Sequence, residues 1–419
     1  MIISRTKNEL GQIRNMKIAQ IAPIIERVPP KKYGGTERVV YTLTENLLKR
    51  GHEVTLFASG DSLTSGTLQS IIPRSMRELG IRDLYGLNEW PLMNLGQAYK
   101  MQSEFDLIHD HHHYISLPTS HLAQKPVIMT LHGPVTVNQK KMFSMFNNPH
   151  VVTISHAQLP NPGQINHAGV IHNGLDMENY PFSAEHEGYL LFVGRMSEEK
   201  GVHVAIEVAR TLGLPLIIAA KLDRIDRRHF EEKVEPYLND NQIKWVGEVD
   251  EHQRNDLMSK AMCLLHPISF REPFGLNMIE AMACGCPVIA FRRGSIPEII
   301  EDGKTGFIVE DTVEMIEKLE NIDQIDRAHC REHSLTNFNA DKMTDAYEEV
   351  YRQVLEADKQ PLDQIIPDSI QTNDQIASQI ASQTNTRLNK TSNNGQSLAR
   401  KQKLITNPEV LFSDKFLKT

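Results

Sequence analysis

The segment REPFGLNMIEAMACGCPVIAF, residues 271–291, combines a chain break, a short helix and a strand in immediate succession. The Pro-Phe-Gly break keeps Glu272 out of helical geometry, so we expect the helix to begin near Gly275 or Leu276. The apolar run PVIAF that follows has the composition of a buried strand. Inside the helix, Glu280 stands between apolar neighbours, where a carboxylate without a partner is costly to bury. The segment therefore predicts an α/β fold and raises the question of which partner Glu280 has.

Strand-like and helix-length segments alternate along most of the chain. Short runs rich in β-branched residues are separated by segments long enough for a helix, which is typical of a parallel sheet with helices on both faces. The pattern begins at residue 16 and restarts at residue 189, so it predicts two α/β halves. The expected strands are residues 16–23, 52–59, 105–110, 126–133, 150–156, 189–195, 214–221, 243–249, 262–268, 287–291 and 305–309.

The sequence outside these two halves has a different character. The stretch after Glu356 is rich in Gln, Asn, Ser and Thr and has little to bury. Before it, Met343, Tyr347 and Val350 mark one apolar face of a last helix. The expected parts are an N-terminal extension (1–15), a first Rossmann-like domain (16–180), a second one (185–335), a closing helix that returns to the first domain (336–356) and a polar, disordered tail (357–419).

Composition and charge limit the classes of function. The chain has 419 residues, of which 40% are hydrophobic and 23% charged, values typical of a globular protein with two domains. A formal net charge of −8 without a basic stretch argues against nucleic acid as a partner. No signal peptide or membrane-spanning run is evident, which leaves only peripheral membrane contact. The four cysteines match no zinc spacing, so we expect a reducing, cytoplasmic protein.

The N-terminus of the helix near Leu276 is a candidate anion site. Backbone amides point at a ligand there, and the preceding glycine permits a close approach. Two carboxylates beside such a site are unsuited to phosphate, but Glu272 and Glu280 could accept hydrogen bonds from sugar hydroxyls. The alternative is structural: Glu272 favours the helix dipole, and Glu280 is satisfied or solvated.

A second motif, GRMSEEKG at residues 194–201, follows a strand and opens a helix. The planar fork of Arg195 and the compact charge of Lys200 together suit a diphosphate. Surface cations are common at such turns, so the motif gains weight from the two glutamates in the same half. Cations for a diphosphate and carboxylates for sugar hydroxyls together predict a nucleotide-sugar pocket.

A glycine pair in the first half, in YGGTER, stands between a strand and a helix. Gly34 and Gly35 would let backbone amides approach a ligand closely. The alternative is an ordinary loop before a helix that Thr36 caps and Gly51 ends. The segment lacks the G-x-G-x-x-G fingerprint of dinucleotide binding.

Taken in this order, the motifs resemble the family 4 glycosyltransferases, which are retaining enzymes of the GT-B fold. The matching elements are the GG-x-E loop, the N-G-x-D connector at residues 173–176, G-R-x4-K-G, and E-P-F-G-L-x3-E-A, over about residues 16–355. The resemblance implies two Rossmann-like, doubly wound parallel-sheet domains that face a cleft, with the C-terminal helix crossing back to the first domain.

The resemblance also implies roles for individual residues in binding a nucleoside diphosphate sugar. Arg195 and Lys200 would hold the donor diphosphate and stabilise its departing charge, helped by backbone amides near Leu276. Glu280 would accept the ribose hydroxyls, which would account for its burial. Glu272 would hydrogen-bond the donor sugar near its reacting carbon, and we do not assign it as a covalent nucleophile. The remaining expected contacts are Gly35, Phe274 and Gly275 with the donor and Gly34 with the acceptor.

Three histidines of the first half follow expected strands. His132, in TLHGP, matches a histidine of the family and would orient the donor sugar or help the acceptor lose its proton. The alternative is a core or loop histidine. His109 and His111, in HDHHHY, match an H-x-H strand end and would line the acceptor cleft. Adjacent side chains on an extended run point to opposite sides, so we expect no metal site there, and the resemblance implies no cofactor.

We therefore expect a cytoplasmic, metal-independent, retaining glycosyltransferase that moves a sugar from a UDP-, GDP- or ADP-linked donor to an acceptor hydroxyl. The acceptor could be a sugar, a lipid-linked molecule or a small molecule. Two alternatives stay open: a non-hydrolysing sugar-nucleotide epimerase with the same two-domain architecture, and a non-catalytic nucleotide-sugar-binding protein. The paired G-R-x4-K-G and E-P-F-G motifs argue against the epimerase.

Overall fold

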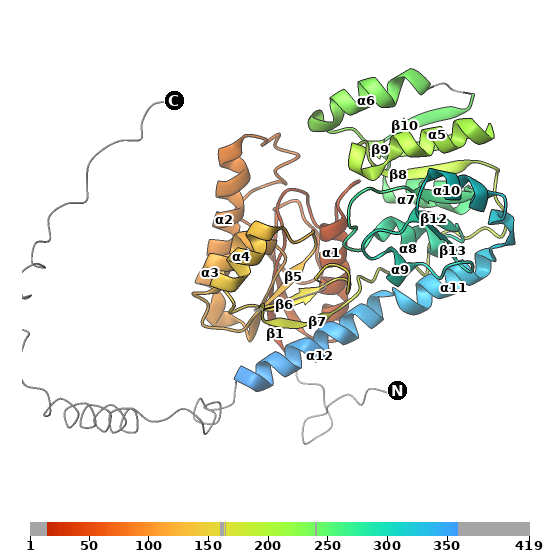
Figure 1. Ribbon diagram of the computed structural model, residues 1–419. Helices are drawn as coiled ribbons and strands as arrows, with labels where there is room; N and C mark the ends of the chain where they lie inside the picture. The colour runs from red at the N-terminus through yellow and green to blue at the C-terminus, as the bar shows by residue number, and fades with distance from the viewer. Residues whose placement is uncertain (1–14, 160–162, 164, 239–240, 359–419) are drawn as a thin grey trace, which may run out of the picture. The chain divides into compact units, whose positions relative to one another are not determined.

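We describe the protein from a computed structural model, in which the described residues are 15–159, 163, 165–238 and 241–358. The predicted extension, apart from residue 15, and the predicted tail, apart from residues 357 and 358, lie outside the described residues. The described part contains two α/β halves, each built on its own sheet (Figure 1).

The first half is built on a seven-stranded parallel sheet in the order β3-β2-β1-β4-β5-β6-β7. Strand β1 lies between β2 and β4, and Ile18 pairs with Val54 on one side and with Leu107 on the other. The strand order reverses at β1, which is the pattern of a doubly wound sheet. The strands are β1 (Lys17–Ile21), β2 (Glu53–Phe57), β3 (Thr67–Gln69), β4 (Leu107–Asp110), β5 (Val127–Leu131), β6 (His150–Thr153) and β7 (His167–Val170).

The second half repeats this plan with a six-stranded parallel sheet in the order β10-β9-β8-β11-β12-β13. Here the order reverses at β8, so both sheets are doubly wound, and the predicted fold class is confirmed. The strands are β8 (Leu190–Arg195), β9 (Leu216–Lys221), β10 (Ile243–Gly247), β11 (Cys263–His266), β12 (Val288–Phe291) and β13 (Gly306–Val309).

Most of the successive parallel strands are connected through helices, as crossovers require. In the first half these are α1 (Gly35–Lys49), α2 (Leu84–Lys100), η1 (Gln102–Glu104), η2 (His113–Ser116), α3 (Leu117–Ser120) and α4 (Val137–Met145). In the second half they are η3 (Glu198–Lys200), α5 (Val202–Leu212), η4 (Arg224–Asp226), α6 (Arg227–Lys233), η5 (Glu235–Tyr237), α7 (Glu251–Lys260), α8 (Leu276–Ala283) and α9 (Ile296–Ile299). The chain then continues through α10 (Thr312–Leu319), η6 (Ile322–Gln324), α11 (Arg327–Asn337) and α12 (Ala340–Asp358).

Helix α12 lies along the first half, although it follows the second half in the sequence (Figure 1). The face predicted from the sequence, Met343, Tyr347 and Val350, is buried in one cluster with Leu43 and Leu47 of α1. Burying a large apolar side chain contributes roughly 1.5–3 kcal/mol. This apolar face therefore holds the last helix on the first half.

Every predicted strand has a counterpart, but the structure adds β3 and β7. Both are short edge strands whose side chains are exposed or half-buried, so they lack the apolar pattern of a buried strand. The prediction that Thr36 caps α1 was wrong. The N-cap is Gly34, and no side chain caps the helix. A glycine suits this position because an added Cβ would lie 2.7 Å from Pro30 Cβ.

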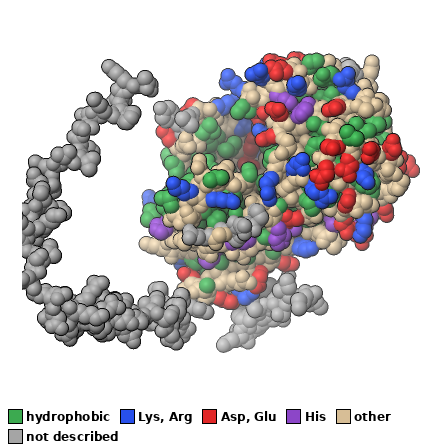
Figure 2. All heavy atoms as spheres, in the orientation of Figure 1, with side chains coloured by type: hydrophobic (Ala, Val, Ile, Leu, Met, Phe, Trp, Pro, Cys, Tyr) green, Lys and Arg blue, Asp and Glu red, His purple; other side chains and the backbone are tan. Residues whose placement is uncertain are grey.

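The surface gives two further observations. None of the helices in the described ranges is long and apolar enough to cross a membrane. On the face shown in Figure 2, acidic and basic side chains are interspersed over the second half.

Candidate functional site

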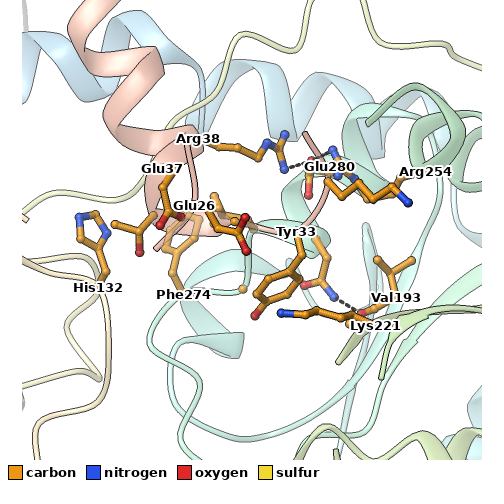
Figure 3. A pocket seen from close by; sticks show the side chains of 18 of the residues that line it. Glu26, Tyr33, Glu37, Arg38, His132, Val193, Lys221, Arg254, Phe274 and Glu280 are labelled. Carbon is orange, nitrogen blue, oxygen red and sulfur yellow. Dashed lines mark hydrogen bonds and ion pairs between the residues drawn. The ribbon is translucent and has the colours of Figure 1, made fainter. Parts of the chain in front are cut away.

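A cavity of about 420 Å³ lies where loops and helix N-termini of the two halves meet. The first half contributes the loop between β1 and α1 and the loop after β5. The second half contributes the ends of β8, β9 and β10 and the start of α8. Ligands of parallel sheets bind at the carboxyl ends of the strands, as here. The predicted site residues in its wall are Gly34, Gly35, His132, Lys200, Glu272, Phe274, Gly275, Leu276 and Glu280. Figure 3 shows His132 and Arg254 at opposite ends of this cavity.

Lys200 and Glu272 form an ion pair in the cavity wall. Lys200 Nζ lies 2.7 Å from Glu272 Oε2, and His266 Nε2 lies 3.5 Å from the same oxygen. Lys200 follows β8 and Glu272 follows β11, two neighbouring strands. Burial raises the pKa of Glu272, but the Lys200 charge and the contact with His266 outweigh it and bring the pKa to about 2. Glu272 is therefore a carboxylate at neutral pH and can accept hydroxyl donors.

Helix α8 begins at the same cavity. Its N-cap, Gly275, has a left-handed φ of 85°, and a Cβ there would come 2.5 Å from a side chain in the first turn. Ser295 fixes the preceding loop: its hydroxyl donates to the Phe274 carbonyl at 2.9 Å and its amide to the Glu272 carbonyl at 3.0 Å. The first amides of a helix lack intrahelical partners and carry partial positive charge. They are therefore available to an anion in the cavity whose wall also contains Lys200.

Two arginines account for the burial of Glu280. Arg38 Nη1 lies 2.5 Å and Arg254 Nη2 lies 2.6 Å from Glu280 Oε1. Arg38 also donates to the Tyr180 hydroxyl at 2.9 Å and lies 3.2 Å from Glu251 Oε2. Ribose hydroxyls are therefore not needed to explain the burial of this carboxylate, and its contact with them stays a prediction. Cations supplied by α1 and α7 satisfy Glu280, and buried carboxylates require such partners.

Of the three predicted histidines, only His132 lines the cavity. His109 and His111 are 0% and 2% exposed, so the prediction that they line the acceptor cleft was wrong. The strand end that carries them turns their rings into the interior of the first half. Burial, with the nearby His113, lowers the pKa of His132 to about 3. An imidazole with this pKa is uncharged at neutral pH and a poor proton acceptor, which favours an orienting role.

Arg195 is not among the residues that line the cavity, in contrast to Lys200. Its guanidinium group forms an ion pair with Glu199 and lies 3.9 Å from Asp226 Oδ2. Burial raises the pKa of the cavity residue Tyr33, and the Arg195 charge opposes that rise. Arg195 therefore lies within electrostatic reach of the cavity but not in its wall.

Glu37 is a buried carboxyl group in the cavity wall. Burial raises its pKa to about 7, although the backbone amides of Glu37 and Glu26 oppose the rise. The group is therefore close to half-protonated at neutral pH. Sequence reasoning included it only as the acidic position of the GG-x-E loop.

Sequence reasoning missed Arg38, Arg254 and Lys221, which also line the cavity. A signal existed for Arg38, because a cation in the first turn of a helix opposes the macrodipole and needs a counter-ion. Lys221 ends a predicted strand, at the edge of the sheet where ligands bind. Arg254 lies in the largely polar helix α7, EHQRNDLMSK, which carries no such signal.

Two family models match consecutive parts of the chain. The model described as Glycosyltransferase Family 4 matches residues 33–179. The model described as Glycosyl transferases group 1 matches residues 177–334. The boundary between the two matches falls between the last strand of the first sheet and the first strand of the second.

Known proteins of similar sequence and structure cover most of the chain. The N-acetyl-alpha-D-glucosaminyl L-malate synthase of Bacillus anthracis is 24% identical over 380 residues, which cover 78% of this chain and 96% of that protein. The sucrose-phosphate synthase of Thermosynechococcus elongatus superposes with a TM-score of 0.69 at 20% identity, covering 82% of this chain and 100% of that one. HepE of Anabaena, solved in complex with UDP-glucose, superposes with a TM-score of 0.63 at 18% identity, covering 81% and 100%.

Two doubly wound parallel sheets with a cavity between them, and a last helix that returns to the first half, define the GT-B fold of glycosyltransferases. The protein is a glycosyltransferase, and the two family matches and its relatives give the particular group. The chain belongs to the family 4 glycosyltransferases.

Proposed function

We propose that this glycosyltransferase moves a sugar from a nucleoside diphosphate sugar to an acceptor hydroxyl, with retention of configuration and without a bound metal ion. The observation that carries the proposal is the Lys200–Glu272 pair beside the N-terminus of α8. A cation, a helix N-terminus and a carboxylate that can accept hydrogen bonds from hydroxyl groups therefore occur together. The complex of the Anabaena protein with UDP-glucose supports this class of donor.

The donor diphosphate would lie between Lys200 and the first amides of α8. An ammonium group has three donors, so Lys200 could bind a phosphate oxygen while it holds Glu272. Both the cation and the helix end are fixed before the reaction and would stabilise the charge that grows on the leaving diphosphate. Arg195, within electrostatic reach, would add to this stabilisation.

The two carboxylates would bind hydroxyls at different parts of the donor. Glu272 would accept hydrogen bonds from hydroxyls of the transferred sugar, since it lies beside the proposed diphosphate site. Glu280 would accept the ribose hydroxyls. Arg38 and Arg254 make their closest contacts with Glu280 Oε1, so Oε2 would accept the hydrogen bonds from the two ribose hydroxyls.

The acceptor would approach from the first-half wall, where His132 and Glu37 lie. Its hydroxyl must lose a proton during transfer. His132, with a pKa of about 3, is a poor base, whereas Glu37, with a pKa of about 7, and the departing diphosphate are better suited. His132 would therefore orient a hydroxyl by hydrogen bonding.

A thermal-unfolding panel tests the donor site. UDP, GDP, ADP and their common sugar conjugates are added to wild type, to Lys200→Ala and to Lys260→Ala. The last variant is a control, because it removes an exposed lysine of α7 that is not among the residues lining the cavity. A ligand at about 100 times its Kd adds about 2.7 kcal/mol, which raises the midpoint by roughly 2–4 °C in a chain of this size. One nucleotide class should stabilise wild type and Lys260→Ala but not Lys200→Ala.

The outcomes separate this function from its alternatives. No stabilisation of folded wild type by any nucleotide would refute the donor site, and an equal response of Lys200→Ala would refute the role of Lys200. Once a nucleotide binds, incubation of its sugar conjugate with candidate acceptors and mass analysis distinguish three results. Transferred sugar supports the proposal, an epimerised donor indicates an epimerase, and an unchanged donor indicates a binding protein.

A further inference from the structure

A chain of hydrogen bonds runs from the cavity into the interior of the first half. It begins at His132, whose Nε2 lies 2.9 Å from Nδ1 of His111. The other ring nitrogen of His111, Nε2, lies 2.8 Å from the side-chain Oε1 of Gln20, on β1. Gln20 and His111 are 0% and 2% exposed. Both therefore lie behind His132, which lines the cavity.

The chain continues from Gln20 to helix α12. The Gln20 amide donates to the Tyr351 hydroxyl at 3.5 Å, and this hydroxyl lies 2.6 Å from Nδ1 of His109. His109 Nε2 lies 2.7 Å from Thr130 Oγ1, which lies 2.9 Å from the Tyr347 hydroxyl. The chain thus ends on two tyrosines of the last helix, which packs on the first half through the apolar face described above.

Gln20 determines the direction of the hydrogen bonds on both sides, because its carboxamide has a distinct acceptor and a distinct donor. Its Oε1 can only accept, so the proton of neutral His111 is on Nε2. Nδ1 of His111 then carries a lone pair and can only accept, so the proton of His132 is on Nε2. Nδ1 of His132 is left unprotonated, and among the described residues it has no hydrogen-bond partner.

We propose that Gln20 and His111 are positioning residues that hold His132 in the tautomer protonated on Nε2, so that Nδ1 meets the ligand as a hydrogen-bond acceptor. An acceptor at this place suits a hydroxyl and rejects a phosphate oxygen, which has no proton to donate at neutral pH. This role rests on the proposed function only for the identity of the hydroxyl, which belongs to the donor sugar or to the acceptor.

The chain can fix a tautomer because its imidazoles are neutral. Burial lowers the pKa of His109 and of His111 well below the ordinary value, and neighbouring histidines add to the effect. A protonated imidazole would have no lone pair to accept the next hydrogen bond. Because His132 and His111 are neutral, the hydrogen bonds run in one direction: His132 donates to His111, and His111 donates to Gln20.

Nitrogen NMR measures the tautomer directly. In protein labelled with ¹⁵N-histidine, long-range ¹H–¹⁵N correlations distinguish a protonated ring nitrogen from one with a lone pair, and the spectrum of His132→Asn assigns the His132 signals. Wild type is expected to show His132 protonated on Nε2. Gln20→Met, which removes the acceptor with little change in volume, is expected to show both tautomers.

A further variant separates this role from a loss of packing. Tyr347→Phe is the matched control: it removes a buried hydroxyl from the far end of the same chain and is expected to leave the His132 signals unchanged. If Gln20→Met does not fold, the tautomer of His132 in the wild-type spectrum still decides the question.

His132 protonated on Nδ1 in wild type would overturn the proposal, and so would an unchanged single tautomer in folded Gln20→Met. The measurement needs no sugar nucleotide, so a failure of nucleotide binding would refute the proposed function and leave the tautomer result intact. Where transfer is measured, Gln20→Met is expected to lower kcat roughly tenfold or more with little change in the donor KM, because a wrong tautomer impairs the reacting complex more than ground-state binding.

Discussion

Arg38 Nη1 and Glu280 Oε1 lie 2.5 Å apart, although Arg38 belongs to the first half and Glu280 to the second. Their side chains are 10% and 3% exposed, so water screens the pair little. Arg254, from the same half as Glu280, contacts the same oxygen. The carboxylate proposed to bind the donor ribose is therefore also a point at which the two halves contact each other. We expect nucleotide binding and the contact between the halves to be coupled.

A double-mutant cycle of Arg38→Met and Glu280→Gln is expected to show a coupling energy of about 1–3 kcal/mol, because the two groups are buried and in contact. Unfolding in urea, followed separately by Trp90 in the first half and Trp245 in the second, measures it. The matched control is Arg292–Glu310, a pair at 2.7 Å whose side chains are 48% and 61% exposed. Its coupling should stay below about 1 kcal/mol, and equal coupling in both cycles would contradict the prediction.

Lys200→Met is expected to raise the pKa of Glu272, because the burial remains and the cation is gone. In wild type the pKa of Glu272 is about 2, below the ordinary 4.5, so its contribution to stability is fully present above pH 4.5 and is lost as the pH falls through about 2. The destabilisation caused by Lys200→Met should therefore be largest near pH 7 and should shrink below pH 4.5.

Unfolding midpoints between pH 7 and pH 3 measure this difference. Lys260→Met, which breaks an exposed pair with Asp256, serves as the control. A gap between wild type and Lys200→Met that stays constant over this range would show that Glu272 does not depend on Lys200 for its charge.

Glu37→Gln is expected to change how stability depends on pH. The pKa of Glu37 is raised from 4.5 to about 7 in the folded protein, so the folded state binds more protons than the unfolded state between these values. The stability that Glu37 contributes is then fully present below pH 4.5 and is lost as the pH rises through about 7. This contribution is roughly 3 kcal/mol at most. The glutamine variant lacks this loss and should be more stable than wild type at pH 8 but not at pH 5.

Thermal unfolding of both proteins at pH 5 and pH 8 checks this expectation. Glu317→Gln, which changes an exposed carboxyl group of α10, should follow wild type at both pH values. If Glu37→Gln and Glu317→Gln behave alike, Glu37 does not titrate near neutral pH.

Gly275→Ala is expected to destabilise the start of α8 and to weaken nucleotide binding. Gly275 has a φ of 85°, and a Cβ there would lie 2.5 Å from Met278 Cε and 3.4 Å from Glu272 Cγ. The left-handed conformation alone costs about 1–2 kcal/mol for a residue with a Cβ. Gly80→Ala provides the control, because Gly80 has a φ of 68° with no atom within 4 Å of the added Cβ. Thermal unfolding should show the larger loss at Gly275, and equal losses would mean that the close contacts are relieved without cost.

Sequence patterns gave the local elements of the site. The Pro-Phe-Gly break after Glu272 placed the start of α8 near Gly275 or Leu276, and the helix begins at Leu276, because helix starts are encoded by neighbouring residues. Lys200 and Glu272 were both expected at a donor site, and the structure brings them into contact. His109 and His111 were misplaced because a strand end fixes where a residue lies but not which neighbours cover it. The partners of Glu280 were missed because Arg38 and Arg254 belong to other helices, and no local pattern pairs either of them with Glu280.

By itself, the sequence determined that this protein has two parallel sheets with helices between their strands, since burial repeats with the period of each local element. It also determined that a glycine precedes the helix near Leu276, and that the family motifs supply both cations and carboxylates. Only the tertiary structure decided which of these groups meet. His109 and Tyr351 are 242 positions apart in the chain, yet they are hydrogen-bonded because α12 returns to the first half. Arg38 meets Glu280 for the same kind of reason: a buried charge takes the partner that packing brings to it, whatever its distance along the sequence.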